Sequence, residues 1–251
     1  MSRGILVTGA SAGLGRAIAT AFAERGDRVA VHYHANQSAA EATLAALPGD
    51  GHTLVQGDIS EARRIADTAE EALGGVDVLV NNAAVVTTAA TAHPLAETTF
   101  EHWRDVWRRS VEVNLLGAAD VTFCVARHMI ARGVAGRVIN IGSRGAFRGE
   151  SDHPAYGATK AALHSLGQSL AVHLAPHRIA VSSVAPGFIA TERVADWLEG
   201  ERGDALRAQS PFGRVAEPKE IAAAVVYLAS ADAEWAAGSI LDLNGASYLR
   251  S

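Results

Sequence analysis

Short apolar runs alternate with helix-length amphipathic segments along almost the whole chain. The apolar runs have the length of buried strands and cover residues 4–8, 28–33, 53–56, 77–80, 137–141, 179–184 and 239–243. The segments between them have helical periodicity and cover residues 16–25, 39–47, 60–73, 100–132, 154–175 and 218–229. Because strands that alternate with helices form parallel sheets with right-handed crossovers, this order predicts an α/β fold with helices on both faces of one sheet. No linker or repeat interrupts the pattern, so we expect a single domain over residues 1–251.

The composition narrows the class of partner. The net charge is −5 and no long run of basic residues is present, so the electrostatic footprint of a nucleic-acid-binding protein is missing. Cys124 is the single cysteine, which excludes a disulfide within the chain. No apolar stretch reaches the roughly 18 residues that span a bilayer, and the first strand begins too early for a signal peptide to precede it. We therefore expect a cytoplasmic protein that binds neither nucleic acid nor membrane.

A glycine-rich turn, GASAGLG, follows the first predicted strand and leads into the first predicted helix. Glycines at such a turn let backbone amides approach a pyrophosphate at the positive end of the helix. The spacing differs from the standard G-x-G-x-x-G dinucleotide fingerprint. By itself the turn is compatible either with a dinucleotide site or with a tight connection that binds nothing.

The residues after the second strand bear on the choice of dinucleotide. An NAD site usually has an acidic residue here that holds the ribose 2′-hydroxyl, but no carboxylate appears before Glu41. An acid would repel a 2′-phosphate, whereas the side chains of His34, Asn36 and Ser38 could donate hydrogen bonds to one. The segment therefore favours NADP(H). It contains no arginine or lysine, which leaves NAD(H) possible.

The stretch from Ser143 to Lys160 carries the candidate chemistry. Tyr156 and Lys160 are four residues apart, so on a helix they project from the same face. A fixed ammonium beside a phenol favours the phenolate, and we expect Lys160 to lower the pKa of Tyr156 toward the range of general acid–base catalysis. Only Lys160 and Lys219 are lysines in a chain that otherwise uses arginine for its cations. Arginine cannot replace a compact ammonium that must reach two partners.

A metal site is not expected. His173 and His177 have the i, i+4 spacing of a helical metal pair, but Pro176 interrupts the turn between them. No glutamate occupies the position that a catalytic zinc motif requires.

Taken together, the motifs resemble those of the short-chain dehydrogenase/reductase family, and in particular its 3-oxoacyl-carrier-protein reductase-like members. The resemblance covers the chain in order and rests on TGASAGLG (8–15), NNAA (81–84), Asn114, Ser143, YGATK (156–160), PGFIAT (186–191) and the closing stretch from 212 to 245. It implies a single-domain Rossmann fold with a doubly wound, seven-stranded parallel sheet, commonly assembled as a homotetramer.

The resemblance also implies roles for individual residues. Tyr156 would be the general acid in carbonyl reduction and the base in alcohol oxidation, and Lys160 would depress its pKa and hold the nicotinamide ribose. Ser143 would bind the substrate carbonyl, and Asn114 would anchor a water that reprotonates Lys160. The remaining cofactor contacts would be Gly9, Ser11, Gly13, Leu14, Gly15, His34, Asn36, Ser38, Asp58, Ile59, Asn82, Ala83, Pro186, Gly187, Ile189 and Thr191.

The function expected from this resemblance is hydride transfer between a nicotinamide cofactor and a ketone or secondary alcohol, with NADPH-dependent reduction of a 3-oxoacyl-thioester-like carbonyl as the leading case. An NAD-dependent alcohol or sugar dehydrogenase is the alternative, and a non-catalytic nucleotide-sensing regulator is an alternative of another class. We expect Arg144 and Arg148 at the rim of the substrate pocket, where they would hold an acidic tail. The pocket itself would be lined by Val85, Val86, Ala146, Phe147, His153, Phe188, Val194 and Trp197.

Overall fold

The molecule is built around one parallel sheet, as the alternation of apolar runs predicts. The computed structural model describes residues 2–250, with the side chains of Arg193 and Asp196 excepted. The sheet has seven strands in the order β3-β2-β1-β4-β5-β6-β7, and each neighbouring pair is parallel. The strands are β1 (Gly4–Val7), β2 (Arg28–Tyr33), β3 (Thr53–Gln56), β4 (Val78–Asn81), β5 (Gly136–Ile141), β6 (Ile179–Pro186) and β7 (Ile240–Leu243).

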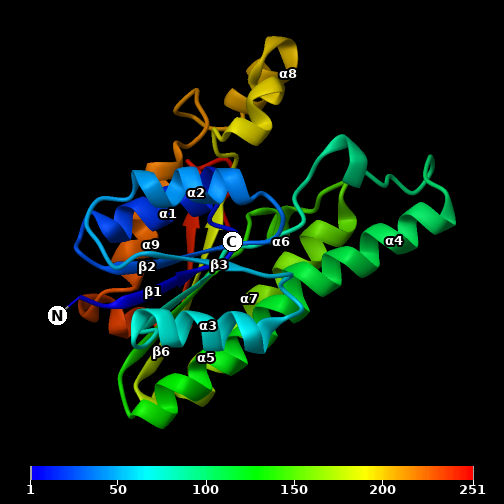
Figure 1. Cartoon of the computed structure of the whole chain (residues 1–251). Helices are drawn as coiled ribbons and strands as arrows, with labels where there is room; N and C mark the ends of the chain where they lie inside the picture. The colour runs from blue at the N-terminus through cyan, green and yellow to red at the C-terminus, as the bar shows by residue number, and fades with distance from the viewer. Residues whose placement is uncertain (1, 251) are drawn as a thin grey trace.

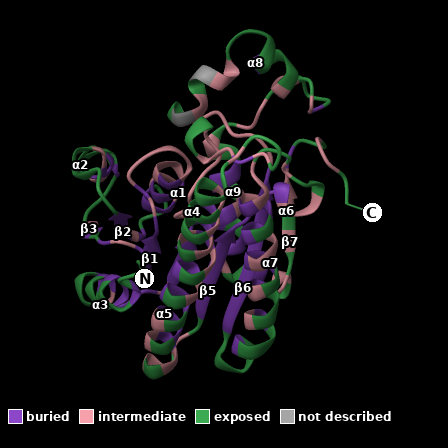
Figure 2. Cartoon of the chain, turned by 90° about the vertical axis from the view of Figure 1, so that its right-hand side faces the viewer, coloured by how far each residue is buried: buried purple, intermediate pink, exposed green. Residues whose placement is uncertain are grey.

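Helices cover both faces of the sheet (Figure 1). One apolar core lies under α1 (Gly13–Ala23), α2 (Gln37–Ala46) and α9 (Pro218–Leu228). A second core lies under α3 (Ala62–Leu73), α5 (Ala118–Arg132) and α7 (Pro154–Leu174). Figure 2 shows the buried strands between these helix layers. Both faces of the central strands are thus buried, which explains why these strands are rich in apolar residues and do not alternate regularly with polar ones.

The helical pattern over residues 100–132 is not one uniform helix. It begins as α4 (Phe100–Val111), passes through a π-helical turn, η2 (Glu112–Gly117), and continues as α5. A methyl group placed on Gly117 would lie 2.7 Å from the side chain of Ile59, so the glycine allows the helix to approach the loop after β3. Asn114 lies within this π turn, which changes the direction in which its side chain projects from the helix.

The segment from Glu192 to Ser210, which lies between the predicted strand 179–184 and the predicted helix 218–229, is largely helical. It contains the 3-10 helix η4 (Glu192–Leu198) and α8 (Gly200–Arg207). In both views α8 stands off the body of the molecule, beyond the carboxyl ends of the strands (Figures 1 and 2). The remaining short elements are η1 (Ala89–Thr91), α6 (Gly145–Arg148), η3 (Ala175–His177) and η5 (Ala231–Ala236). Over residues 2–250, no helix combines the length and apolarity needed to cross a membrane.

Candidate active site

The predicted site residues gather at one edge of the sheet. At least one of them follows the carboxyl end of each strand from β1 to β6, at the crevice where open α/β sheets bind their ligands. These positions are Gly9 after β1, His34 after β2, Asp58 after β3, Asn82 after β4, Ser143 after β5 and Gly187 after β6.

The glycine-rich turn is a tight cradle at the start of α1. Gly9 and Gly13 have φ of 64° and 56°, a left-handed conformation that side chains disfavour. A methyl on Gly15 would lie 2.6 Å from the Asn82 amide nitrogen and would also strike the carbonyl oxygen of Gly9. The Asn82 amide donates to the carbonyl oxygens of Thr8 and Gly9 at 2.9 and 3.0 Å and so holds the turn closed. The first turn of α1 contains no acidic residue, and this cradle therefore fits a pyrophosphate.

His32, which was not predicted as a site residue, holds the same turn through a side-chain hydrogen bond. Its Nδ1 accepts a hydrogen bond from the backbone N–H of Gly9 at 3.1 Å, and its Nε2 lies 3.1 Å from the carbonyl oxygen of Gly57. Burial lowers the pKa of His32 to about 4, so the ring is neutral and can accept at Nδ1. The one signal in the sequence is a polar residue inside an otherwise apolar strand.

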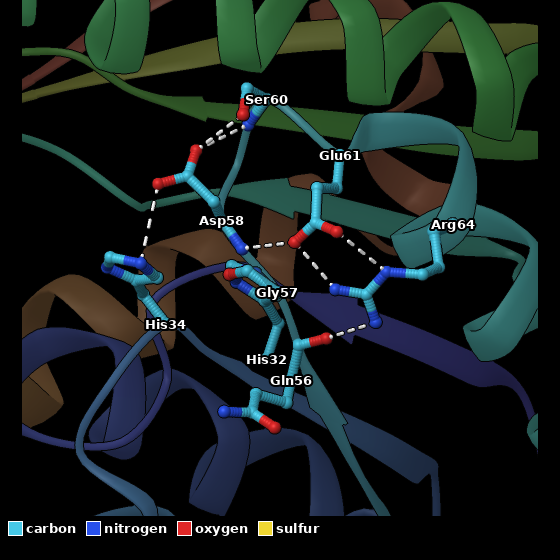
Figure 3. A network of polar contacts seen from close by, with 8 residues as sticks. All are labelled: His32, His34, Gln56, Gly57, Asp58, Ser60, Glu61 and Arg64. Carbon is cyan, nitrogen blue, oxygen red and sulfur yellow. Dashed lines mark hydrogen bonds and ion pairs between the residues drawn. The ribbon is translucent and has the colours of Figure 1, made fainter.

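The adenosine side of the site is arranged differently from the expectation. His34 forms an ion pair with Asp58 at 3.4 Å, so the residue expected near a 2′-phosphate is partnered by the residue expected near adenine (Figure 3). Hydrogen bonds from the backbone and hydroxyl of Ser60 hold the pKa of Asp58 below its usual range. The Asn36 side chain caps α2 by accepting from Ala39 N–H at 3.1 Å.

Among the other expected cofactor positions, Ile59 and Leu14 pack against the apolar cores, and Ile189 and Thr191 lie in the segment after β6. Ile59 is 6% exposed and packs into the apolar core, and Leu14 is partly buried against the opposite core. Ile189 pairs with Ala216 in an isolated bridge. Thr191 lies next to Gly13, since its side chain would be 3.4 Å from a methyl placed there. The segment after β6 therefore returns to the glycine-rich turn. Ser11 lies in the turn after β1, and Ser38 lies in the first turn of α2. Ala83 follows β4, and Pro186 is the last residue of β6.

Tyr156 and Lys160 lie one turn apart in α7, as their spacing predicts. Lys160 is 2% exposed, and its Nζ donates to the carbonyl oxygen of Ile141 at 2.7 Å. Burial lowers the pKa of Lys160 to about 8. Its ammonium lies 5.8 Å from the centroid of the Tyr156 ring.

The expected direction of the Tyr156 pKa is wrong. Burial raises the pKa of this phenol, and the nearby Ser143 hydroxyl offsets only part of that increase. Lys160 is not among the groups that counter this increase, and its ammonium donates to the carbonyl oxygen of Ile141. The Ser143 hydroxyl also accepts from the backbone N–H of Gly145 at 3.0 Å, which fixes its position at the end of β5.

Asn114 joins α7 to the loop after β4. Its Oδ1 accepts from the backbone N–H of Val85 at 2.7 Å, and its Nδ2 donates to the hydroxyl of Thr159 at 3.1 Å. That hydroxyl in turn donates to the carbonyl oxygen of Tyr156 at 3.0 Å. The π turn is what brings this buried amide to both partners, and Thr159 is a member of the site that the sequence reasoning did not single out.

Arg144, which was expected at the rim of the substrate pocket, is buried and bonded to other side chains rather than free to hold an acidic tail. It is 4% exposed, donates to the side chains of Gln209 and Ser247, and lies 5.1 Å from the ring centroid of Phe188. It borders a cavity of about 310 Å³ between the end of α8 and the carboxyl-terminal segment. Arg148 is exposed and donates to the same Gln209 oxygen at 3.3 Å. In the part of the chain that the structure describes, no three acidic, histidine or cysteine side chains form a cluster that could hold a metal ion.

Comparison with known proteins agrees with this architecture. Residues 9–245 match a family described as enoyl-(acyl carrier protein) reductase. The chain is 35% identical to a 3-oxoacyl-[acyl-carrier-protein] reductase of Vibrio cholerae, over 97% of this chain and 96% of that protein. It is 34% identical to an L-rhamnose 1-dehydrogenase (NAD(P)(+)) of a Sphingomonas species, over 98% and 96%.

A solved structure from Brucella melitensis, described as a glucose/ribitol dehydrogenase of the short-chain dehydrogenase/reductase type, superposes with a TM-score of 0.87 at 29% identity. It covers 99% of this chain and 97% of that one. The fold, the glycine-rich turn, the tyrosine–lysine pair and these comparisons lead to one conclusion. The chain belongs to the short-chain dehydrogenase/reductase family of oxidoreductases.

Proposed function

We propose that this protein is an NADPH-dependent carbonyl reductase that acts on 3-oxoacyl-thioester-like ketones. The observation that carries the proposal is the grouping of Ser143, Tyr156 and Lys160 at the carboxyl edge of β5. Burial raises the pKa of Tyr156, so the phenol is protonated at neutral pH but is a weaker acid than a free tyrosine. Its role as proton donor therefore rests on its place beside Ser143. The Vibrio cholerae relative supports the substrate class.

In this reaction, Ser143 and Tyr156 hold the substrate carbonyl oxygen with two hydroxyl groups. Tyr156 gives its proton to that oxygen as negative charge develops there, and Ser143 stabilises the same charge. When bound, the nicotinamide supplies the hydride to the carbonyl carbon. Lys160 supplies the replacement proton to Tyr156, and a pKa of about 8 allows it to release one near neutral pH. Oxidation of an alcohol reverses these transfers.

The proposed preference for NADPH rests on the residues after β2. No carboxylate occurs in this segment before Glu41, and His34 can donate to a 2′-phosphate when protonated. Asp58 works against this preference, because its carboxylate already pairs with His34 at 3.4 Å.

A parallel titration with NADPH and NADH, followed by fluorescence, tests the preference. We expect NADPH to bind at least about 10-fold more tightly, the scale that one charged interaction supplies. His34→Asp should reverse the order, because it places an acid beside the 2′ position, whereas His52→Asp at a distant imidazole should leave it unchanged. Tighter binding of NADH by the wild type would contradict the proposal.

An NAD-dependent alcohol or sugar dehydrogenase is the second candidate. The His34–Asp58 pair favours it, since a neutralised imidazole gains little from a 2′-phosphate, and the Sphingomonas relative is a sugar dehydrogenase. Initial rates with 3-oxoacyl thioesters and NADPH, against sugars and NAD, separate the two candidates. A non-catalytic nucleotide sensor is disfavoured, because Tyr156, Lys160, Ser143 and Asn114 are all in place.

We also propose a homotetramer. Phe100, Leu116 and Phe123 are 65, 48 and 65% exposed along α4, η2 and α5, an apolar surface that assembly would cover. Light scattering should give four times the mass of the chain, and a monomeric mass would contradict the proposal.

We propose a cytoplasmic location as well. It is supported by cysteine usage, because Cys124 is the only cysteine and can form no disulfide within the chain. Cell fractionation of the tagged protein tests this location, and recovery outside the cytoplasm would contradict it.

A further inference from the structure

Imidazoles from three elements hold the loop that follows β4. His93 belongs to this loop, His102 lies in α4 and His153 directly precedes α7. Nε2 of His102 lies 3.1 Å from the carbonyl oxygen of Ala92, and Nε2 of His153 lies 3.0 Å from that of Thr88. The short segment 88–93 is therefore tied to α4 on one side and to the start of the catalytic helix on the other.

His93 contacts α7, the helix that carries Tyr156. It is 1% exposed, with Nδ1 2.7 Å from the carbonyl oxygen of Thr91, and Nε2 accepts from the backbone N–H of Ala155 at 3.2 Å. A carbonyl oxygen can only accept, so Nδ1 carries the proton and Nε2 offers its lone pair. The rings of Trp103 and His153 lie edge-on to the imidazole, with centroids at 5.3 and 6.3 Å, and fix its orientation.

The first turn of α7 depends on this acceptor. Pro154 opens the helix without an N–H, and the side chain of the N-cap residue His153 makes no capping hydrogen bond. Ala155 is fully buried, so its N–H cannot turn to solvent. The side chain of His93 thus accepts a hydrogen bond that a capping side chain normally accepts, although His93 is distant in sequence from the start of α7. The N–H it accepts from is that of Ala155, the residue directly before Tyr156.

The same loop is anchored at its other end by Asn114, which accepts from Val85 N–H at 2.7 Å. Asn114 and His93 each also bond to α7, through Thr159 and Ala155 respectively. We propose that His93 is a positioning residue, which locks the loop to the first turn of α7 and thereby sets the place of the Tyr156 hydroxyl. This inference rests on the proposed role of Tyr156 as proton donor.

Three variants test the proposal in the full-length protein. His93→Leu removes the acceptor, His93→Gln restores an oxygen that can accept from Ala155, and His173→Leu makes the same change at an exposed imidazole of α7. We expect His93→Leu to lower kcat about 10- to 100-fold, the scale of a misplacement near 1 Å, with cofactor affinity changed less than about 2-fold. Amide exchange in residues 155–158 should rise about 10-fold or more, because a lost cap frees the helix end. His93→Gln should recover most of both losses, and His173→Leu should behave as wild type.

The outcomes separate this inference from the proposed function. Unchanged amide exchange in His93→Leu, unchanged kcat, or a His93→Gln variant as impaired as His93→Leu would each overturn the positioning role. If the wild type reduces no carbonyl compound, the proposed function fails, and the exchange comparison alone decides whether His93 holds the helix. If His93→Leu does not fold, His93→Phe takes its place, because it also lacks an acceptor but keeps a ring between Trp103 and His153.

Discussion

Lys160 holds a charge in a place where the protein interior disfavours it. Its side chain is buried, and that burial lowers its pKa to about 8 from the usual 10.5. The folded protein therefore loses stability at neutral pH to keep an ammonium beside Tyr156, and the hydrogen bond to the carbonyl oxygen of Ile141 offsets part of the loss. Stability given up at a functional site is a common pattern in enzymes.

Replacement of Lys160 by methionine should therefore make the protein more stable and inactive. We expect the free energy of unfolding to rise by up to about 3 kcal/mol, the equivalent of the pKa difference, while kcat falls to background. Urea denaturation at neutral pH measures the first quantity and steady-state kinetics the second. Lys219→Met is the matched control, since Lys219 is exposed and its removal should change neither. If the Lys160→Met protein were less stable than the wild type, the ammonium would make a net favourable contribution to the free energy of unfolding.

The hydroxyl of Tyr156 can be tested separately from its ring. Tyr156→Phe should lower kcat by about 10²- to 10⁴-fold, the usual contribution of a positioned general acid, with the dissociation constant of the dinucleotide unchanged. Tyr227→Phe, at an exposed position in α9, should have wild-type kinetics. Retention of kcat within about 10-fold of wild type would remove Tyr156 from the role of proton donor.

At this scale, residue type and spacing predicted which side chains gather at the carboxyl ends of the strands, but not their electrostatics. Tyr156, Lys160 and Asn114 are recognisable because few structural reasons place such side chains where they stand. The direction of the Tyr156 pKa was wrong, because it depends on burial and on where the Lys160 amine points, and spacing records neither. His32 and His93 were missed since each makes its contact to a backbone amide that is distant in sequence.

Among the elements, strands were easier to anticipate than helices. The runs 28–33 and 53–56 coincide with β2 and β3. Each has an apolar centre of the length of a strand, although β3 lies at the edge of the sheet and is only partly buried. The π turn η2 was not anticipated, since a single extra residue per turn scarcely alters the 3.6-residue pattern. The helix α8 was not anticipated either, because it stands off the core and so carries no apolar stripe for a pattern to report.

The turn between β1 and α1 gives a test at this scale. Gly15→Ala should weaken dinucleotide binding at least about 10-fold and cost about 1–3 kcal/mol of stability, because the added methyl would strike the carbonyl oxygen of Gly9 and the Asn82 amide. Fluorescence titration and thermal unfolding measure the two effects.

Gly26→Ala is the control for this substitution. Gly26 has φ of 80° with nothing within 4 Å of an added methyl, so it should lose about 1 kcal/mol to backbone strain and keep its affinity. Equal affinity in the Gly15→Ala and wild-type proteins would show that the cradle tolerates a wider turn.

For the whole molecule, the alternation of strands and helices predicted the architecture, since chain order and right-handed crossovers leave few arrangements for a parallel sheet. What it could not predict is which polar groups the two cores enclose. His32 lies between the glycine-rich turn and the end of β3. His164 lies in α7 with its ring stacked on Phe147 at 5.1 Å.

These two buried imidazoles should control how stability varies with pH. Burial lowers the pKa of each to about 4 from the usual 6.5. The unfolded chain therefore binds protons at a higher pH than the folded protein does. The stability that neutral rings contribute is fully present above about pH 6.5 and is lost as the pH falls toward about 4. Each ring should account for up to about 3 kcal/mol of that loss.

Urea denaturation at several pH values between about 7 and about 4 measures this dependence. The free energy of unfolding should fall with a slope that approaches two protons in the wild type and one proton in His164→Leu, which has no ring to protonate. His177→Leu, at an exposed imidazole in η3, should keep the wild-type slope. If His164→Leu and the wild type have the same slope, His164 is not protonated on unfolding in this range. The acid sensitivity would then have to come from His32, whose neutral ring must accept from Gly9 for the dinucleotide cradle to keep its shape.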